Sequence, residues 1–135
     1  MPIKVGWYDE RQRIWSQVFT GSWTLDEYWE SVDKTHRALD SVAPHPVYIF
    51  TEIRGTLRLP PGMLTALRTV SAQARAHERI HVIIGGGMIV RSLFRVGQAI
   101  VPNPHIRLAD TLEEALMLIE QMIVHDQTRA KQGSE

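Results

Sequence analysis

Apolar and polar positions alternate along the first twenty residues, which predicts a β-hairpin. Ile3, Val5 and Trp7 fall on one face of this alternation. Residues 9–12 are polar and have the composition of a turn, and residues 13–20 are rich in β-branched and aromatic side chains. We therefore expect two antiparallel strands joined by a short turn.

The apolar period then changes from two to about 3.6, which predicts a helix. Thr24 and Glu27 have the spacing of a capping box, in which each side chain pairs with a backbone N–H at the helix start. The expected inward face comprises Leu25, Trp29, Val32, His36 and Leu39. The helix is expected to end near Ser41, because Pro44 and Pro46 cannot continue it.

Three more strands alternate with three more helices in the rest of the chain. The patterns predict strands at residues 47–53, 80–84 and 106–109, and helices at residues 62–76, 88–100 and 112–123. The order ββαβαβαβα predicts a single α/β domain over residues 1–125, with four helices and a mixed five-stranded sheet in which parallel strands follow the hairpin. Residues 126–135 are polar, and we expect them to be a disordered tail.

Composition restricts the class of protein. The chain has 135 residues, 44% of them hydrophobic and 22% charged, which are ordinary globular values. It contains no cysteine, which excludes disulfides and cysteine nucleophiles. No apolar run reaches the ~18 residues that a membrane span needs, and the first residues lack the apolar stretch of a signal peptide. We expect a cytoplasmic protein with no membrane insertion.

Charge is distributed unevenly, although the net charge is zero. Residues 54–107 carry eight arginines against one glutamate, whereas both ends of the chain are acidic. The basic stretch fits either an anionic partner or the acidic ends of the same chain or of a second subunit. Nucleic acid is not an expected partner, because the chain lacks a compact basic cluster with interleaved aromatic residues.

The sharpest local motif is a strand followed by three glycines and a helix. A helix start that follows glycines can bind an anion through free backbone N–H groups. The candidate ligand-binding residues are Gly85, Gly86, Gly87, Met88, Arg91 and Arg95, with Arg54 and Arg58 as weaker candidates. The alternative is a tight turn flanked by ordinary solvated arginines.

Most of the aromatic residues lie in the first 29 positions and give both faces of the hairpin apolar area. One face can pack on the first helix, and the other needs a cover. We therefore expect a homodimer, and the candidate interface residues are Trp7, Trp15, Phe19 and Trp23.

Catalytic and metal motifs are missing from the sequence. The six histidines have no metal-ligand spacing, and no serine lies in a nucleophile elbow. We expect no metal, no cofactor and no enzymatic activity.

The element order, together with the segment VYIFTEIRGTLRLPPGML at residues 47–64, resembles the STAS superfamily of anti-sigma-factor antagonists, whose members have a SpoIIAA-like fold. The resemblance implies a small α/β module that works by docking to a regulatory protein partner. In regulatory members a phosphorylated serine precedes the second helix, but this chain has Leu59-Pro60-Pro61-Gly62 there, with no hydroxyl. We therefore predict a non-catalytic interaction module without that switch. Related families with this topology bind lipids, so the alternative prediction is a binder of a small anionic or lipid-like ligand at residues 85–87.

Overall fold

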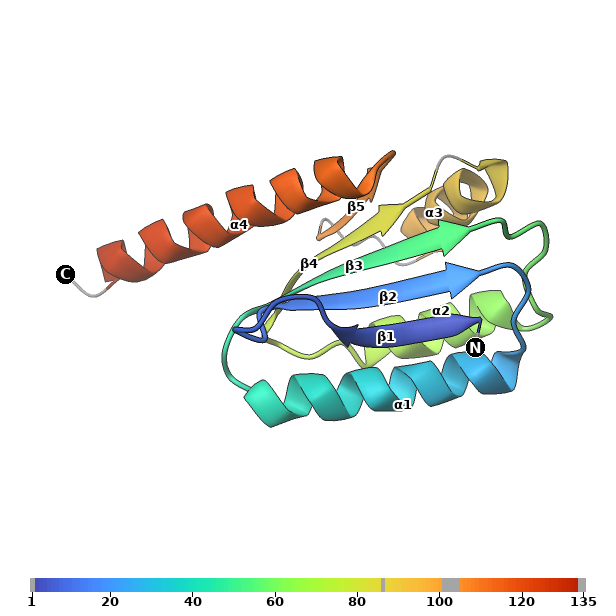
Figure 1. Ribbon diagram of the computed structural model, residues 1–135, viewed down its shortest axis with the longest axis horizontal. Coiled ribbons are helices and arrows are strands. Elements are labelled where there is room, and N and C mark those ends of the chain that lie inside the picture. The colour runs from blue at the N-terminus through green and yellow to red at the C-terminus, as the bar shows by residue number, and fades with distance from the viewer. Residues whose placement is uncertain (1, 86, 101–104, 134–135) are drawn as a thin grey trace.

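The computed structural model describes residues 2–85, 87–100 and 105–133. Its elements are β1 (Ile3–Trp7), β2 (Ile14–Thr20), α1 (Leu25–Val42), β3 (Val47–Arg54), α2 (Met63–Ala72), β4 (Glu78–Ile84), α3 (Met88–Ile100), β5 (Ile106–Ala109) and α4 (Leu112–Gly133). The strands form one five-stranded sheet in the order β1-β2-β3-β4-β5 (Figure 1). β1 is antiparallel to β2, and every later pair is parallel. The predicted element order and mixed sheet are confirmed.

The strand order decides where the helices lie. From β2 onward, each connection leads to the next strand on the same side of the sheet. Because crossovers between parallel strands are right-handed, the helices in these connections all lie on one face of the sheet. Accordingly α1 and α2 lie on one face and α4 lies on the other (Figure 1). Side chains of α3 share a pocket with those of α2, on the same face.

The sheet therefore separates two apolar cores. The core beneath α4 contains Ile14, Tyr48, Phe50, Ile80, Val82, Ile84, Ala109, Ala115, Ile119 and Ile123. The opposite face carries two clusters, one made of Phe19, Trp23, Tyr28, Val32, Met63 and Ala66 and the other of Trp15, Leu39, Val47 and Ile49. Strand β3 is buried on both faces over residues 47–51, as its apolar run predicts, whereas β4 is buried on the α4 face and only half-buried on the other, where His81 and Ile83 line the pockets.

Helix α1 begins with the predicted capping box. The backbone N–H of Glu27 donates to Thr24 Oγ1 at 3.1 Å, and that of Thr24 donates to Glu27 Oε1 at 3.0 Å. The predicted inward face is wrong at one position, because Trp29 is exposed and Tyr28 is buried instead. The helix is rotated so that Thr35, a polar residue, also faces inward, where its hydroxyl is hydrogen-bonded.

The predicted disordered tail is also wrong. Helix α4 continues to Gly133, beyond the expected end. Asp126, within the expected tail, accepts hydrogen bonds from the Tyr48 hydroxyl and the Arg79 guanidinium. These long-range bonds attach the helix to the amino-terminal ends of β3 and β4. At α2 the difference is smaller, since the helix ends at Ala72 rather than residue 76.

Candidate ligand-binding site

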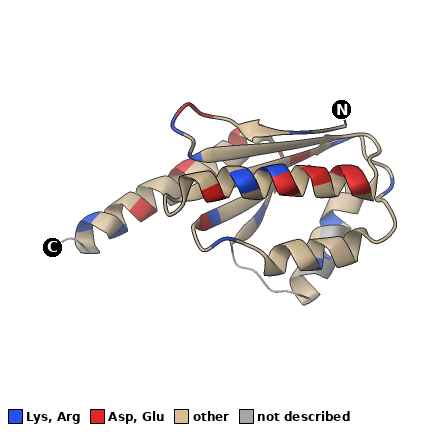
Figure 2. Ribbon diagram, turned by 90° about the horizontal axis from the view of Figure 1, so that it is seen from below, with Lys and Arg blue, Asp and Glu red and all other residues tan. Residues whose placement is uncertain are grey.

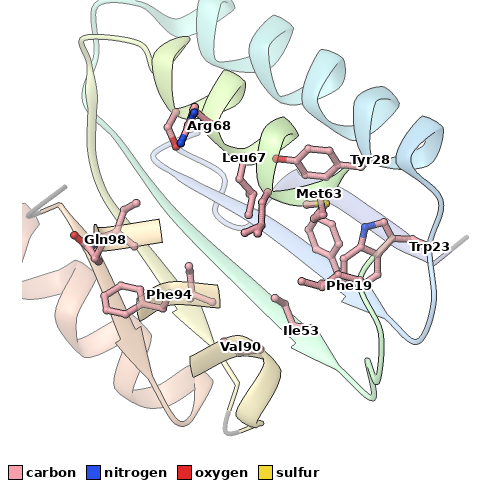
Figure 3. Close-up of a pocket in the computed structure, with 15 residues that line it drawn as sticks. Phe19, Trp23, Tyr28, Ile53, Met63, Leu67, Arg68, Val90, Phe94 and Gln98 are labelled. Carbon is pink, nitrogen blue, oxygen red and sulfur yellow. The ribbon is translucent and has the colours of Figure 1, made fainter. Parts of the chain in front are cut away.

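A pocket of about 150 Å³ lies between the sheet and the helices α2 and α3; we call it the apolar pocket (Figure 3). Its apolar lining consists of Phe19, Trp23, Tyr28, Ile53, Leu59, Met63, Leu64, Leu67, Ile83, Val90, Phe94 and Ile106. Its other lining residues are Arg68, Ser71 and Gln98.

Helical periodicity places these side chains. Met63 and Leu67 are four residues apart on α2, and Val90, Phe94 and Gln98 continue the same spacing on α3. In Figure 3 the two helices present these side chains toward one another across the sheet. The apolar pocket is thus the space between these two sets of side chains on α2 and α3.

Two polar atoms in this lining lack hydrogen-bond partners among the described residues. The Nε1 donor of Trp23 is buried without a partner, and the residue is only 6% exposed. The Tyr28 hydroxyl also has no hydrogen bond to the described residues, and it points toward Leu67 in Figure 3. Burial raises the pKa of Tyr28 to about 12, so its hydroxyl is protonated at neutral pH.

A second pocket of about 390 Å³ adjoins the first; we call it the polar pocket. The two pockets have in common Phe19, Tyr28, Leu67, Ser71, Ile83 and Ile106. The polar pocket extends toward the amino ends of β3 and β4, where Gln17, Thr35 and His81 line it. An amphipathic molecule could therefore occupy both pockets at once.

Hydrogen bonds fix the α1 side of the polar pocket. Trp15 Nε1 donates to Thr35 Oγ1 at 3.0 Å, and the Thr35 hydroxyl donates to the Ser31 carbonyl oxygen at 2.8 Å. The Gln17 amide oxygen lies 3.4 Å from the same hydroxyl oxygen. Because Thr35 has a single hydroxyl hydrogen and the bond to Ser31 is shorter, Gln17 gains little from this contact.

The network continues across the strands. Gln17 Nε2 donates to Thr51 Oγ1 at 3.0 Å, and Thr51 Oγ1 lies 2.6 Å from His81 Nε2. Gln17 and Thr51 are direct partners in the β2–β3 register, which brings the two side chains together. Burial lowers the pKa of His81 to about 4, so the imidazole is neutral at pH 7.

Charged side chains at the border of the polar pocket have partners. Arg75 forms a bidentate pair with Asp40, at 2.9 and 3.1 Å, and its backbone N–H donates to Glu78. Arg79 forms a bidentate pair with Asp126, with both distances 3.0 Å. These ion pairs leave the polar pocket without a free charge from these groups.

The sequence-predicted glycine site lies at the carboxyl edge of the parallel strands, where Gly85 follows β4. A side chain at Gly85 would lie 3.3 Å from Val90 Cγ2 and 3.5 Å from the Ile53 carbonyl oxygen. The close packing of α3 on the sheet thus accounts for a glycine here. Gly86 lies outside the described residues, Gly87 is exposed, and Met88 is 83% exposed.

Two of the predicted arginines, Arg54 and Arg91, have acidic neighbours. Arg54 forms two hydrogen bonds with Glu52, at 2.7 and 3.0 Å, and Arg91 lies 3.7 Å from Asp110. Arg58 and Arg95 are exposed. Figure 2 shows basic residues spread over several elements rather than gathered on one face. Anion binding at the three glycines stays a prediction.

The predicted interface residues lie mostly inside the protein. Trp15, Phe19 and Trp23 are 4%, 5% and 6% exposed, and α1 and α2 cover them. Trp7 is half-buried, with its ring centroid 5.0 Å from that of Trp15 in an edge-to-face contact. The expectation that this aromatic face needs an external cover is therefore wrong for the three buried side chains. The homodimer itself stays a prediction.

Most of the pocket residues could not be recognised from the sequence. In the sequence, Met63 and Leu67 have the spacing of the buried side of a helix, and His81 lies in a predicted strand next to the helix-to-strand junction. The spacing of Met63 and Leu67 indicates a buried helical face, but it does not indicate a cavity beside that face.

Among the described residues, no group of three or more His, Asp or Glu side chains is arranged to hold a metal. No described helix is both long and apolar enough to cross a bilayer.

Comparison with known proteins supports the fold. No family model matches the chain, and no curated protein matches it. Among solved structures, it is similar to an uncharacterized protein of the DUF3478 family with a SpoIIAA-like fold from Shewanella loihica PV-4. The TM-score is 0.67 and the identity 15%, over 86% of this chain and 92% of that one. The chain therefore has a SpoIIAA-like fold, as the resemblance implies.

Proposed function

We propose that this protein is a non-catalytic module that binds a small amphipathic molecule between the sheet and the helices α2 and α3. The observation that carries the proposal is the apolar pocket itself, whose lining includes the indole of Trp23, with a buried Nε1 donor that has no partner among the described residues. An unpaired buried donor costs about 1–3 kcal/mol. A hydroxyl or carbonyl oxygen of a bound molecule would remove that cost if the indole turned its Nε1 toward the pocket.

Pocket size and chemistry support the same function. An apolar cavity of about 150 Å³ is large enough to hold a benzene-sized group. Known ligand sites combine mostly apolar walls with a few placed polar groups, and the apolar pocket has this composition. The adjoining polar pocket extends the space available to a longer molecule.

The test is calorimetric titration with 1-octanol and n-octanoate as probes. Saturable binding of at least one probe is expected, with a concentration-dependent rise in Tm. Ser71→Leu should weaken binding at least tenfold, because Ser71 lines both pockets and the larger side chain fills them. Thr69→Leu is the matched control, since Thr69 is exposed on the same helix. Failure of both probes to bind, or unchanged binding in the Ser71 variant, would contradict the proposal.

A second candidate function is docking to a regulatory protein, and we propose that it would respond to the ligand. Leu59 belongs to the loop where the STAS resemblance implies a docking switch, and it also lines the apolar pocket. A bound molecule would therefore contact that loop directly. Hydrogen exchange at residues 55–59 should slow when 1-octanol is added. Unchanged exchange in this loop at saturating 1-octanol would contradict a ligand-dependent docking role.

A further inference from the structure

We infer that the bound molecule carries an uncharged, hydroxyl-bearing headgroup, which occupies the polar pocket and hydrogen-bonds to His81 and Gln17. The inference rests on the proposed function, and it adds the chemistry and position of the headgroup. Three features of the described residues carry it: the continuity of the two pockets, the hydrogen-bonding capacity left in the network, and the pairing of the surrounding charges.

Continuity allows one molecule to reach both regions. Tyr28, Leu67 and Ile83 contribute to both linings, so they mark the junction between the pockets. A chain lying along the apolar pocket, against Phe94 and Met63, is directed at this junction. Its polar end then enters the space beside β3 and β4.

The network leaves one hydrogen-bonding position on each of two side chains. A neutral imidazole has one donor nitrogen and one acceptor nitrogen. Thr51 occupies Nε2 of His81, and no described residue hydrogen-bonds to Nδ1. On Gln17, the amide nitrogen bonds Thr51, while the amide oxygen has only its 3.4 Å contact to Thr35.

A hydroxyl group fits this arrangement. It can donate one hydrogen bond and accept others, so it pairs with Nδ1 of His81 in either imidazole tautomer. It can at the same time bond the Gln17 amide. A carboxylate accepts hydrogen bonds only, and an ammonium group donates only, so each satisfies fewer of these groups.

The pairing of nearby charges disfavours an ionised headgroup. Arg75 is bound to Asp40 and Arg79 to Asp126, and burial lowers the pKa of His36, with a smaller contribution from Arg75. An anion that entered the polar pocket would lose hydration without gaining an unpaired arginine, and this desolvation is costly. Glu78 also lines the polar pocket and, among the described residues, accepts only a backbone N–H from Arg75, so the n-octylammonium arm of the experiment tests whether a cation pairs with it.

Arg68 offers the competing position for an anion. It lines the apolar pocket and is exposed, so a carboxylate could remain near water at the rim and place its chain inward. Water already solvates this guanidinium, and an exposed ion pair contributes little to affinity. The half-buried Gln17 and His81 side chains of the polar pocket, each with one hydrogen-bonding position that no described residue fills, have more to gain from a ligand.

The experiment compares 1-octanol, n-octanoate and n-octylammonium, which have the same chain length, by calorimetric titration of the full chain at pH 7.5. We expect 1-octanol to bind at least tenfold more tightly than either ion. His81→Phe should weaken 1-octanol binding about tenfold, as the loss of one buried hydrogen bond implies. Circular dichroism spectra and Tm would establish that this variant is folded.

A spectroscopic readout on the unaltered protein avoids dependence on that variant. Addition of 1-octanol should shift the ¹⁵N resonance of His81 Nδ1, while the exposed His45 resonances stay in place. Tighter binding of n-octanoate that is lost in Arg68→Gln would overturn the headgroup assignment but leave ligand binding intact. An unchanged His81 resonance at saturating 1-octanol would overturn it as well. Absence of binding by all three probes would refute the proposed function too.

Discussion

The Tyr48 hydroxyl donates a 2.8 Å hydrogen bond to a carboxylate oxygen of Asp126, joining β3 to a helix residue 78 positions later in the chain. Arg79, on the neighbouring strand, holds both oxygens of the same carboxylate. One acidic side chain therefore connects α4 to two adjacent strands.

We expect Asp126→Asn to lower the free energy of unfolding by about 1–3 kcal/mol, because the charge-assisted bonds from Arg79 are weakened inside a partly buried site. Urea unfolding at pH 7 measures the change. Glu120→Gln is the control, since Glu120 is exposed on the same helix and should change stability by less than about 0.5 kcal/mol. Equal effects of the two substitutions would contradict the structural role of Asp126.

The same carboxylate makes stability sensitive to acid. Burial raises the pKa of Asp126, but hydrogen bonds from Arg79 and Tyr48 outweigh burial and leave the pKa below its ordinary 3.8. A carboxyl whose pKa is lowered on folding stabilises the protein above the unfolded value, and this contribution is lost as the pH falls through the folded pKa. Unfolding measured between pH 5 and 2 should show this loss, which Asp126→Asn should reduce.

His81 should produce a second pH dependence at milder acidity. Its pKa is lowered from 6.5 to about 4 by burial, so the unfolded chain binds a proton that the folded chain does not between these values. Stability should be complete above pH 6.5 and fall toward pH 4, by up to about 1.4 kcal/mol per pH unit. His81→Gln should flatten this slope, whereas His36→Gln should retain most of it. Identical slopes in the two variants would refute the assignment to His81.

Substitution of Trp15 and of Trp23 tests whether the Nε1 donor of Trp23 is unpaired. Trp15 Nε1 donates to Thr35, whereas Trp23 Nε1 has no partner among the described residues. In ligand-free protein, Trp15→Phe should destabilise more than Trp23→Phe, by about 1 kcal/mol or more, since both lose similar area but only one loses a hydrogen bond. Thermal and urea unfolding of both variants measure this difference. The reverse order would indicate that the Trp23 donor is satisfied in the ligand-free protein.

Gly62 should tolerate no side chain without strain. It precedes α2 with φ of +85°, a left-handed conformation that costs an L residue about 1–2 kcal/mol. Gly62→Ala should therefore destabilise by about that amount in urea unfolding. Gly6→Ala is the control, because no atom lies within 4 Å of a Cβ built there and its φ is unstrained. A neutral Gly62 variant would show that the loop before α2 adjusts.

The fold was predictable because its signals are local. The capping spacing of Thr24 and Glu27 and the alternation in β1 each depend on a few neighbouring residues. The end of α4 was not predictable in this way. Asp126 reads as a solvent residue in a polar segment, and only the register of β3 and β4 brings Tyr48 and Arg79 to it.

The site was much less predictable, since it depends on pairing between distant segments. The chain contains many central arginines, but Arg75 and Arg79 are bound to Asp40 and Asp126, which lie outside that basic stretch. Aromatic abundance near the N-terminus suggested an interface, whereas Trp23 is covered by the protein's own helices. A cavity between the apolar faces of two helices results from how the helices pack, so the hydrophobic periodicity of either helix cannot reveal it.

The lining of the apolar pocket comes largely from two crossover helices, whereas the hydrogen-bonded ladder between the strands does not depend on those side chains. Evolution could therefore alter which molecules are accepted by exchanging side chains on α2 or α3, one helix at a time, while strand pairing persists. The set of ligands that the protein binds can thus change while the sheet keeps its structure.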